Sequence, residues 1–297
     1  MNNNCLIECI PNFSEGRDPD VIGAIRDSIL KNSDAQIWDH SSDRDHNRSV
    51  FTIAGTPAAM EDAVMSFTRT AAELINMETH EGVHPCIGAV DVIPFVPLKD
   101  ITMEDCIAFS DSIAGRIAEE LSLPVYLYAK SAKKAAHIRL ADIRRGGYHG
   151  LKQVIRSDPD RRPDYGPLCL PAAGGVSVGA RDFLIAYNIF LDTTDTAPAK
   201  RIAKKIRESS GGFPGVQAIG LSVSGMAQVS MNLLDYRKTS MRDVFFAVKS
   251  EAERLGISVY GSELIGMLPR AAMQGTDADE LLLRNFSPSR FLEEHYS

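Results

Sequence analysis

Cysteine is scarce in this sequence, and no two cysteines form a C-x-x-C pair. The chain has 297 residues and five cysteines, an odd number without a regular spacing. Disulfide frameworks and structural zinc sites depend on closely spaced cysteine pairs. We therefore expect reduced thiols, as in a protein of the cytoplasm, where disulfides are rare.

Long apolar runs and an excess of positive charge are also missing. No apolar run approaches the roughly 20 residues that cross a bilayer, and residues 1–5 lack the basic and apolar parts of a signal peptide. The sequence holds 32 Lys and Arg against 39 Asp and Glu, a net charge of −7, with no basic cluster. We expect a cytoplasmic protein with no membrane or nucleic-acid partner, although a site for a small anion stays open.

The sequence does contain regularly alternating apolar patterns. With 44% apolar and 24% charged residues it can bury a full core. The first half predicts the order β-α-β-β-α-β, followed by a further helix and strand. The predicted strands are residues 6–10, 36–41, 49–55, 89–96 and 125–128, and the predicted helices are residues 18–31, 57–75 and 102–121.

The second half repeats the β-α-β-β-α-β order of ferredoxin-like folds. Its predicted strands are residues 183–191, 216–223, 226–233 and 258–260, and its predicted helices are residues 194–207, 240–255 and the tail from residue 277. Ser224-Gly225 predicts a hairpin turn. We expect an α+β protein of two ferredoxin-like subdomains, residues 1–179 and 180–297, packed around a ligand groove.

The segment between the halves, residues 153–179, is rich in Asp, Pro, Gly and Arg. Connections of this length are usually functional or disordered. Its Gly-rich backbone, with Tyr165 alongside, either forms a wall of a ligand site or is a plain linker.

The stretch HEGVHP at residues 80–85 fits the H-E-x-x-H pattern of zinc proteases, which needs one continuous helix through both His. Gly82 and Pro85 disfavour that helix, and the preceding helix should end near His80 with Gly82 just beyond it. We therefore expect no metal, and a loop that presents His84 as an acid–base group.

Polar residues at the ends and faces of the predicted strands are further candidates. Asn47 and Arg48 lie just before the predicted strand at residues 49–55, where an arginine suits a bidentate carboxylate contact. Gln228, Ser230 and Asn232 alternate along one strand face, where they are either solvated or supply hydrogen bonds to a heterocycle.

Together these segments resemble the formiminotransferase family, the glutamate formimidoyltransferases of histidine degradation. The matching stretches include ECIPNFSEG at residues 8–16, NRSV at residues 47–50, HP at residues 84–85 and AQVSMNL at residues 227–233. Such matches run through nearly the whole chain. We expect the monofunctional form, without the cyclodeaminase domain of the animal bifunctional enzymes.

The resemblance implies transfer of a formimino group from N-formimino-L-glutamate to N5 of tetrahydrofolate. Tetrahydrofolate is then a co-substrate, and no metal or redox cofactor is needed. The family's fold is two ferredoxin-like subdomains with folate in the groove between them, and the chains form a homodimer.

The resemblance also assigns residues. The family's catalytic His falls on His84, as general acid and base, and its folate-contacting stretch falls on residues 166–174. Arg48, Arg144 and Arg181 become candidate clamps for the carboxylates of the donor and of folate. The expected binding residues are Asn12, Asn47, Arg48, His80, Asp91, Arg144, Tyr165, Gly166, Pro167, Pro171, Gly174, Arg181, Gln228, Ser230 and Asn232.

Three positions depart from well-known members, whose loop is H-K/R-G-E-H-P-R-M-G-A. Here Val83 replaces the Glu before His84, and Cys86 replaces the Arg two places after it. An Asp that supports the His in animal enzymes corresponds to Ser41, with Asp39 and Asp43 as substitutes nearby. The alternatives are therefore a related formyl transfer to tetrahydrofolate, a catalytically silent folate-binding protein and the zinc hydrolase.

Overall fold

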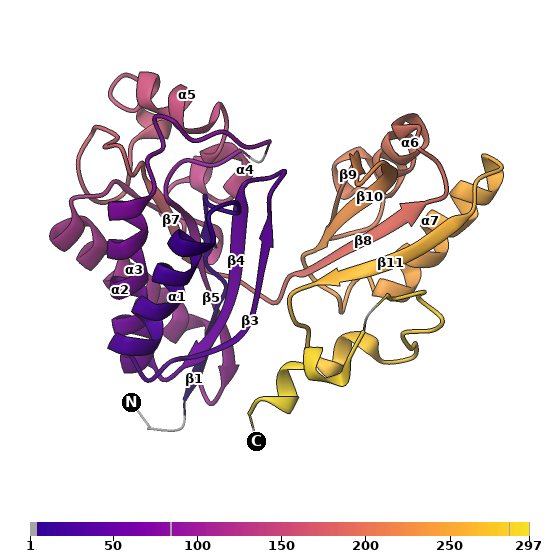
Figure 1. Ribbon diagram of the computed structural model, residues 1–297, viewed down its shortest axis with the longest axis horizontal. Helices are drawn as coiled ribbons and strands as arrows, with labels where there is room; N and C mark the ends of the chain where they lie inside the picture. The colour runs from indigo at the N-terminus through magenta and orange to yellow at the C-terminus, as the bar shows by residue number, and fades with distance from the viewer. Residues whose placement is uncertain (1–4, 84, 285, 297) are drawn as a thin grey trace. The chain divides into compact units, whose positions relative to one another are not determined.

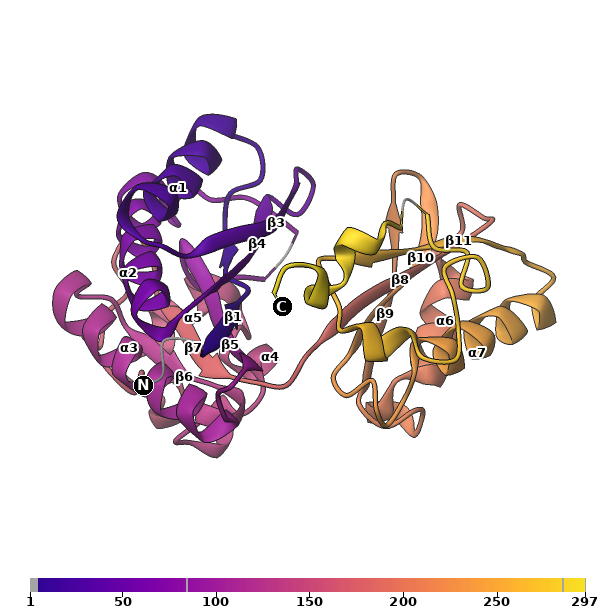
Figure 2. The same cartoon turned by 90° about the horizontal axis from the view of Figure 1, so that it is seen from below.

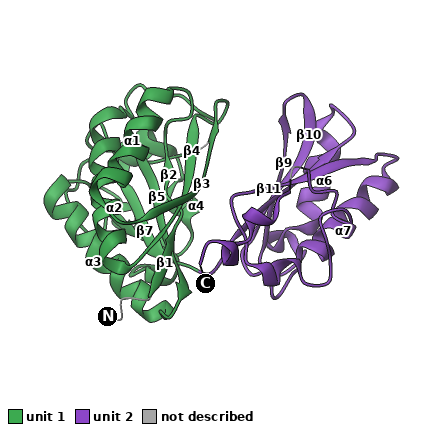
Figure 3. Ribbon diagram, turned by 60° about the horizontal axis from the view of Figure 1, so that its bottom comes forward, with its two compact units in different colours: residues 1–181 green, residues 182–297 purple. Residues whose placement is uncertain are grey.

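The computed structural model describes residues 5–83, 85–284 and 286–296. The chain divides into two compact units, residues 1–181 and 182–297 (Figure 3). In the described part of the chain, no helix is both long and apolar enough to span a membrane.

Unit 1 is built on one sheet that is mostly antiparallel. Its first four full strands lie in the order β3-β4-β1-β5, and the short β2 continues the line of β1 between β4 and β5. Strands β7 and β6 extend the sheet beyond β5 in parallel. The strands are β1 (Leu6–Cys9), β2 (Asn12–Phe13), β3 (Gln36–Asp43), β4 (Arg48–Gly55), β5 (Val90–Lys99), β6 (Val125–Leu127) and β7 (Val176–Ala180).

Three long helices cover one face of this sheet (Figure 1): α1 (Pro19–Asn32), α2 (Pro57–Leu74) and α3 (Met103–Leu121). Each begins at a side chain that caps its free amides, as Thr102 and Asp105 do reciprocally at the start of α3. Phe13 of β2 packs edge-on against Phe67 of α2, with ring centroids 5.3 Å apart. Residues that alternate with Phe13 along β2 and β4 point to the opposite face of the sheet.

The segment between the two halves, residues 153–179, is an ordered part of unit 1. After β6 come two short helices, α4 (Leu140–Ile143) and α5 (Gly147–Val154), and then a loop that leads into β7. Asp164 in that loop accepts hydrogen bonds from the buried His137 and from the Leu127 amide, at 2.9 and 2.8 Å. The plain-linker interpretation of residues 153–179 is wrong, because β7 is buried between β5 and β6.

Unit 2 is a four-stranded antiparallel sheet in the order β11-β8-β10-β9, with α6 and α7 packed on one face (Figure 2). Its elements are β8 (Ile185–Leu191), α6 (Thr196–Ile206), β9 (Val216–Val223), β10 (Met226–Leu233), α7 (Met241–Arg254) and β11 (Val259–Ile265). The turn between β9 and β10 is the predicted one, because Ser224 and Gly225 both adopt positive φ, 49° and 79°. The alternate residues Tyr187, Ile189 and Leu191 are buried against the helices.

Three further predictions need correction. Helix α2 ends at Leu74 with Ile75 as its C-cap, so Gly82 does not terminate it. Strand β11 runs to Ile265, well beyond the predicted residues 258–260. The described tail from residue 277 forms turns and short 3₁₀ helices, because it pairs back on β11 and on the segment after it, with bridges from Ser262 to Leu283 and from Leu268 to Phe291.

Candidate active site

A narrow recess in unit 1 brings together predicted site residues that are far apart in the sequence. It is lined by Asn12, Phe13, Ser14, His46, Asn47, Arg48, His80, Cys86 and Asp91. Five of these were predicted as site residues from the sequence. Asn12, Arg48 and Asp91 come from the adjacent strands β2, β4 and β5, Asn47 comes from the turn before β4, and His80 comes from the loop after α2.

Strand alternation explains why Asn12 and Arg48 meet. Phe13 and Phe51 pack into the helix-covered core, so their neighbours at odd spacing, Asn12 and Arg48, point to the other face. There an Arg48 amino group donates to Asn12 Oδ1, and Asn12 Nδ2 donates to the Ile10 carbonyl at 2.9 Å. Asn12 is therefore a fixed acceptor that orients the Arg48 guanidinium.

Asp91 is aimed by a β-bulge. Val90 and Val92 pair with the consecutive residues Phe13 and Asn12, which leaves Asp91 as the extra residue. Its Oδ1 accepts the Ile87 amide at 2.9 Å, and its Oδ2 accepts an amino group of Arg144, which follows α4. Arg144 is thus linked to the recess by its contact with Asp91, which lies 53 positions earlier in the sequence.

The recess carries more positive than negative charge. Burial, reinforced by the nearby charge of Arg144, lowers the pKa of Arg48 to about 10, which still leaves it cationic at neutral pH. Burial and the carboxylate of Asp91 raise the pKa of Cys86 to about 11, so its thiol is neutral. The Nε groups of Arg48 and Arg144 are buried without a hydrogen-bond acceptor among the described residues. Two cations thus share one carboxylate, and such a site favours an anion.

His84 itself lies outside the described residues, but both flanks of its loop are fixed. On the N-terminal side of residue 84, Asn47 Nδ2 donates to the Glu81 carbonyl at 3.0 Å and lies 3.4 Å from His80 Nδ1. Asn47 Oδ1 accepts the Gly16 amide at 2.9 Å. Burial lowers the pKa of His80, which favours its neutral form.

On the C-terminal side of residue 84, the glycine-rich segment before β7 holds Ile87 and Ala89 through backbone hydrogen bonds. The Gly175 amide donates to the Ile87 carbonyl at 2.9 Å, and the Ala89 amide donates to the Ala173 carbonyl at 2.8 Å. Gly174 has φ +78°, and a Cβ added there would lie 2.2 Å from the Ile87 oxygen. The predicted site residue Gly174 therefore permits a close backbone approach between this segment and Ile87.

Other predicted residues of that segment make structural contacts. The Tyr165 hydroxyl donates to Asp111 Oδ1 at 2.8 Å and accepts from Lys133 at 2.8 Å. Gly166, at φ +86°, lies against the Leu123 carbonyl. The Pro171 carbonyl accepts the Tyr148 hydroxyl at 3.1 Å, and Pro167 is half-buried. None of these four lines the recess.

Arg181 lies in a second polar cluster, with Glu8 and Tyr128, and Glu8 was not predicted from the sequence. Burial raises the pKa of Glu8 to about 7, and the charge of Arg181 partly opposes that rise. Arg181 also hydrogen-bonds the buried Tyr128 hydroxyl. A Glu within the apolar strand β1 was the available signal, since a charged residue is rarely buried without a partner.

The three remaining predicted residues lie in unit 2. Gln228, Ser230 and Asn232 share the face of β10 that is turned away from α6 and α7, as predicted. Two residues there were missed, Asn188 and Glu263. Asn188 and Gln228 both donate to Glu263, and these contacts arise only from the pairing of β8, β10 and β11.

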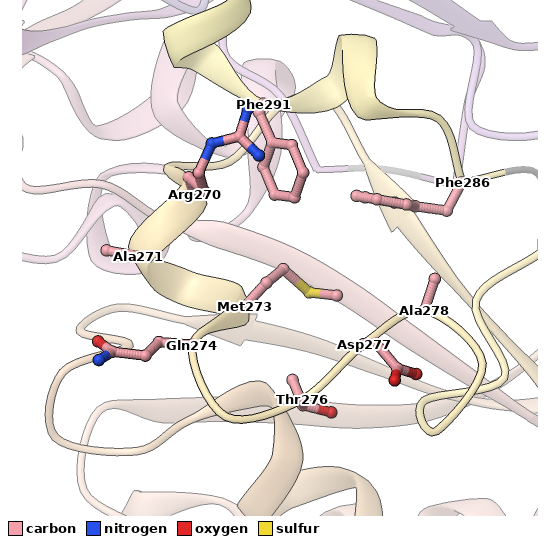
Figure 4. A pocket seen from close by; sticks show the side chains of 9 residues that line it. All are labelled: Arg270, Ala271, Met273, Gln274, Thr276, Asp277, Ala278, Phe286 and Phe291. Carbon is pink, nitrogen blue, oxygen red and sulfur yellow. The ribbon is translucent and has the colours of Figure 1, made fainter.

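The larger hollow of unit 2 contains none of the predicted residues. Figure 4 shows its lining, in which Arg270 stacks on the Phe291 ring at 4.3 Å beside Met273 and Phe286. Within the described ranges, no three His, Cys, Asp or Glu side chains gather as a metal site, and residues 80–83 are not helical. The five cysteines are unpaired, and Cys169 alone among them is exposed.

Two family models together match nearly all of this sequence. The model of the formiminotransferase domain, N-terminal subdomain, matches residues 6–181. The model of the formiminotransferase domain matches residues 186–294.

Named relatives agree with these models. A glutamate formimidoyltransferase of Thermoplasma acidophilum is 41% identical over 292 residues, 97% of this chain and 96% of that protein. One of Streptococcus pyogenes serotype M1 is 40% identical over 98% of both chains. A formimidoyltransferase-cyclodeaminase of Gallus gallus is 41% identical over 98% of this chain but 54% of its own length.

Proposed function

The chain belongs to the formiminotransferase family of transferases, and from this membership we propose that it moves the formimino group of N-formimino-L-glutamate to N5 of tetrahydrofolate. Tetrahydrofolate is then a co-substrate, and the products are 5-formiminotetrahydrofolate and glutamate. The observation that carries the proposal is the recess of unit 1, which is lined by Arg48 and by Asp91, the carboxylate that Arg144 contacts.

The reaction needs one group that accepts and then returns a proton. The N5 amine attacks the formimino carbon, and a tetrahedral intermediate with three nitrogens forms. His84 takes the proton that N5 loses and gives it to the departing glutamate nitrogen as the carbon–nitrogen bond breaks. An imidazole that titrates near neutrality can do both steps, for roughly 10²–10⁴-fold in rate.

The anchors on both sides of His84 support this role. Glu81 is held by Asn47, and Ile87 is held by Asp91 and Gly175, so only five residues span the two fixed points. A catalytic group in a short span between fixed ends loses less freedom when it reaches the reactive geometry. His80, whose lowered pKa favours the neutral form, also contacts Asn47 on the N-terminal side of residue 84.

The donor is a dicarboxylate, and the cationic recess suits one of its carboxylates. We assign this contact to Arg48 and Arg144, whose buried Nε groups lack acceptors among the described residues. Asn12 and Asp91 hold the two guanidinium groups in place. Arg181 is the further candidate clamp, for the glutamate end of folate.

Formyl transfer from the corresponding N-formyl donor is the second candidate. The observation in its favour is Cys86, a neutral thiol in the recess where well-known members have an arginine. A catalytically silent folate-binding protein with the same fold is the third.

Expectations of the family extend to fold and assembly. The strand orders β3-β4-β1-β5 and β11-β8-β10-β9 support ferredoxin-like subdomains, since both follow the split βαβ arrangement. A homodimer and a cytoplasmic location are proposed on the same grounds.

Donor profiling tests the proposal. Purified protein and tetrahydrofolate would be mixed with N-formimino-L-glutamate, N-formyl-L-glutamate or N-formiminoglycine, and the methenyl form produced by acid would be followed by absorbance. We expect turnover with the first donor, and a KM at least about 10-fold higher for the third, which lacks one carboxylate. Turnover with the formyl donor alone would assign the second candidate, and folate binding without any turnover would assign the third.

A further inference from the structure

The helix-free face of the unit 2 sheet carries a carboxylate held by two buried amides. Asn188 Nδ2 and Gln228 Nε2 both donate to Glu263 Oε1, at 2.9 and 3.2 Å. The three residues come from β8, β10 and β11, which lie side by side (Figure 1). Asn188 and Gln228 are only 9% and 3% exposed, whereas Glu263 is half-buried.

The donors and acceptors of this cluster fix what it can offer to a ligand. An ionised carboxylate only accepts hydrogen bonds, so both amides must turn their NH₂ groups toward it. Oε1 receives both, and no residue that the structure describes is seen to donate to Oε2. The cluster thus presents one pre-oriented acceptor oxygen of a carboxylate.

Exposed apolar side chains lie on the same face of the sheet. In the register of the sheet, Asn188 lies between Glu263 and Ser230, and Ser230 is opposite Ile219. Ile219 and Ile265 are 57% and 37% exposed. Sites for flat heterocycles combine apolar surface with a few fixed polar atoms, and this face offers both.

We propose that Glu263 binds the 2-amino edge of the tetrahydrofolate pterin, with the exocyclic amino group donating to Oε2. This assignment rests on the proposed function and names the part of the co-substrate that this face recognises. A carboxylate repels the anionic glutamate tail and attracts the N–H donors of the aminopyrimidine ring. The two amides hold the acceptor before binding, so little side-chain order is lost on association.

Two folates and one substitution test the assignment. The Kd of tetrahydrofolate, and of its analogue with a methyl group in place of the 2-amino group, would be measured by anaerobic calorimetry for wild type and Glu263→Gln. In this variant the side-chain oxygen still accepts from both amides, but its NH₂ faces the ligand donor. We expect wild type to bind the analogue about 10- to 100-fold more weakly than tetrahydrofolate. Glu263→Gln should lose that discrimination.

Glu253→Gln is the control, because Glu253 is exposed on α7 and makes the same charge change in the same unit. If wild type binds both folates equally, or if Glu263→Gln keeps the discrimination, the assignment of Glu263 is wrong and the transferase proposal stands. If wild type binds neither folate, the proposed function itself fails. The wild-type comparison holds even if Glu263→Gln does not fold.

Discussion

Asn47 Nδ2 donates to the backbone carbonyl of Glu81 across 3.0 Å, and this bond joins segments 34 residues apart. Asn47 adopts φ +48°, a region that asparagine tolerates better than most residues. The same side chain accepts the Gly16 amide, so it fixes the turn after β2 and the loop of His84 together.

Replacement Asn47→Asp should therefore reduce turnover more than donor binding. The carboxylate still accepts from Gly16, but it cannot donate to Glu81 and repels that carbonyl. We expect kcat to fall about 10- to 100-fold, because a displaced catalytic group costs this much, while the KM of the donor changes little. Asn32→Asp, at the exposed end of α1, is the control and should leave kcat unchanged. Equal effects of the two variants would contradict the positioning role.

Arg144→Lys should weaken donor binding. Lysine keeps a positive charge beside Asp91 but lacks the planar fork that matches a carboxylate. Loss of a charge-assisted hydrogen bond should raise the KM of N-formimino-L-glutamate about 10- to 100-fold, and the Kd of tetrahydrofolate should stay the same. Arg139→Lys, an exposed arginine before α4, is the matched control. A rise in the tetrahydrofolate Kd alone would instead place Arg144 at the folate.

Glu8→Gln should remove a loss of stability at high pH. Burial raises the folded-state pKa of Glu8 from 4.5 to about 7. The folded state therefore binds a proton that the unfolded state has lost, and stability present below about pH 4.5 declines as the pH rises through 7. The full loss is on the order of 3 kcal/mol.

Urea unfolding of wild type and Glu8→Gln at pH 5 and pH 8.5 measures this term. The variant should match wild type more closely at pH 5 and exceed its stability at pH 8.5. Parallel curves for the two proteins would show that Glu8 ionises normally in the folded state.

Gly174→Ala should displace the clamp of the His84 loop. A Cβ at Gly174 would meet the Ile87 carbonyl at 2.2 Å, and the positive φ adds a conformational cost. Gly256 also has a positive φ, +70°, but open space around it. Gly256→Ala should therefore cost only about 1 kcal/mol of stability, whereas Gly174→Ala should also lower kcat. Equal activity of both variants would argue against the clamp.

The sequence predicted the elements with strong local patterns and missed those that depend on tertiary pairing. The hairpin of β9 and β10 has the predicted bounds, because its alternation and turn residues agree. Strand β7 was not predicted, because its VSVGA sequence is buried on both faces and lacks period-two alternation. The tail pattern from residue 277 suggested a helix, but bridges to Ser262 of β11 and to Leu268 after it prevail over that pattern.

The candidate site shows the same division. Asn12, Asn47 and Arg48 were found because they follow or begin predicted strands. The pairing of Arg144 with Asp91 could not be derived from one sequence, since it depends on a bulge in β5 and on the fold of residues 129–154. Glu263 was missed for a similar reason, because its amide partners lie on two other strands.

The most direct test of the account is formimino transfer by wild type and His84→Ala, with N-formimino-L-glutamate and tetrahydrofolate as substrates. His149→Ala, an exposed histidine on α5, is the control. We predict turnover by wild type and by the control, and a kcat about 10²–10⁴-fold lower for His84→Ala with tetrahydrofolate still bound. Full activity of His84→Ala would contradict the assignment of His84, and no transfer by wild type would contradict the proposed reaction.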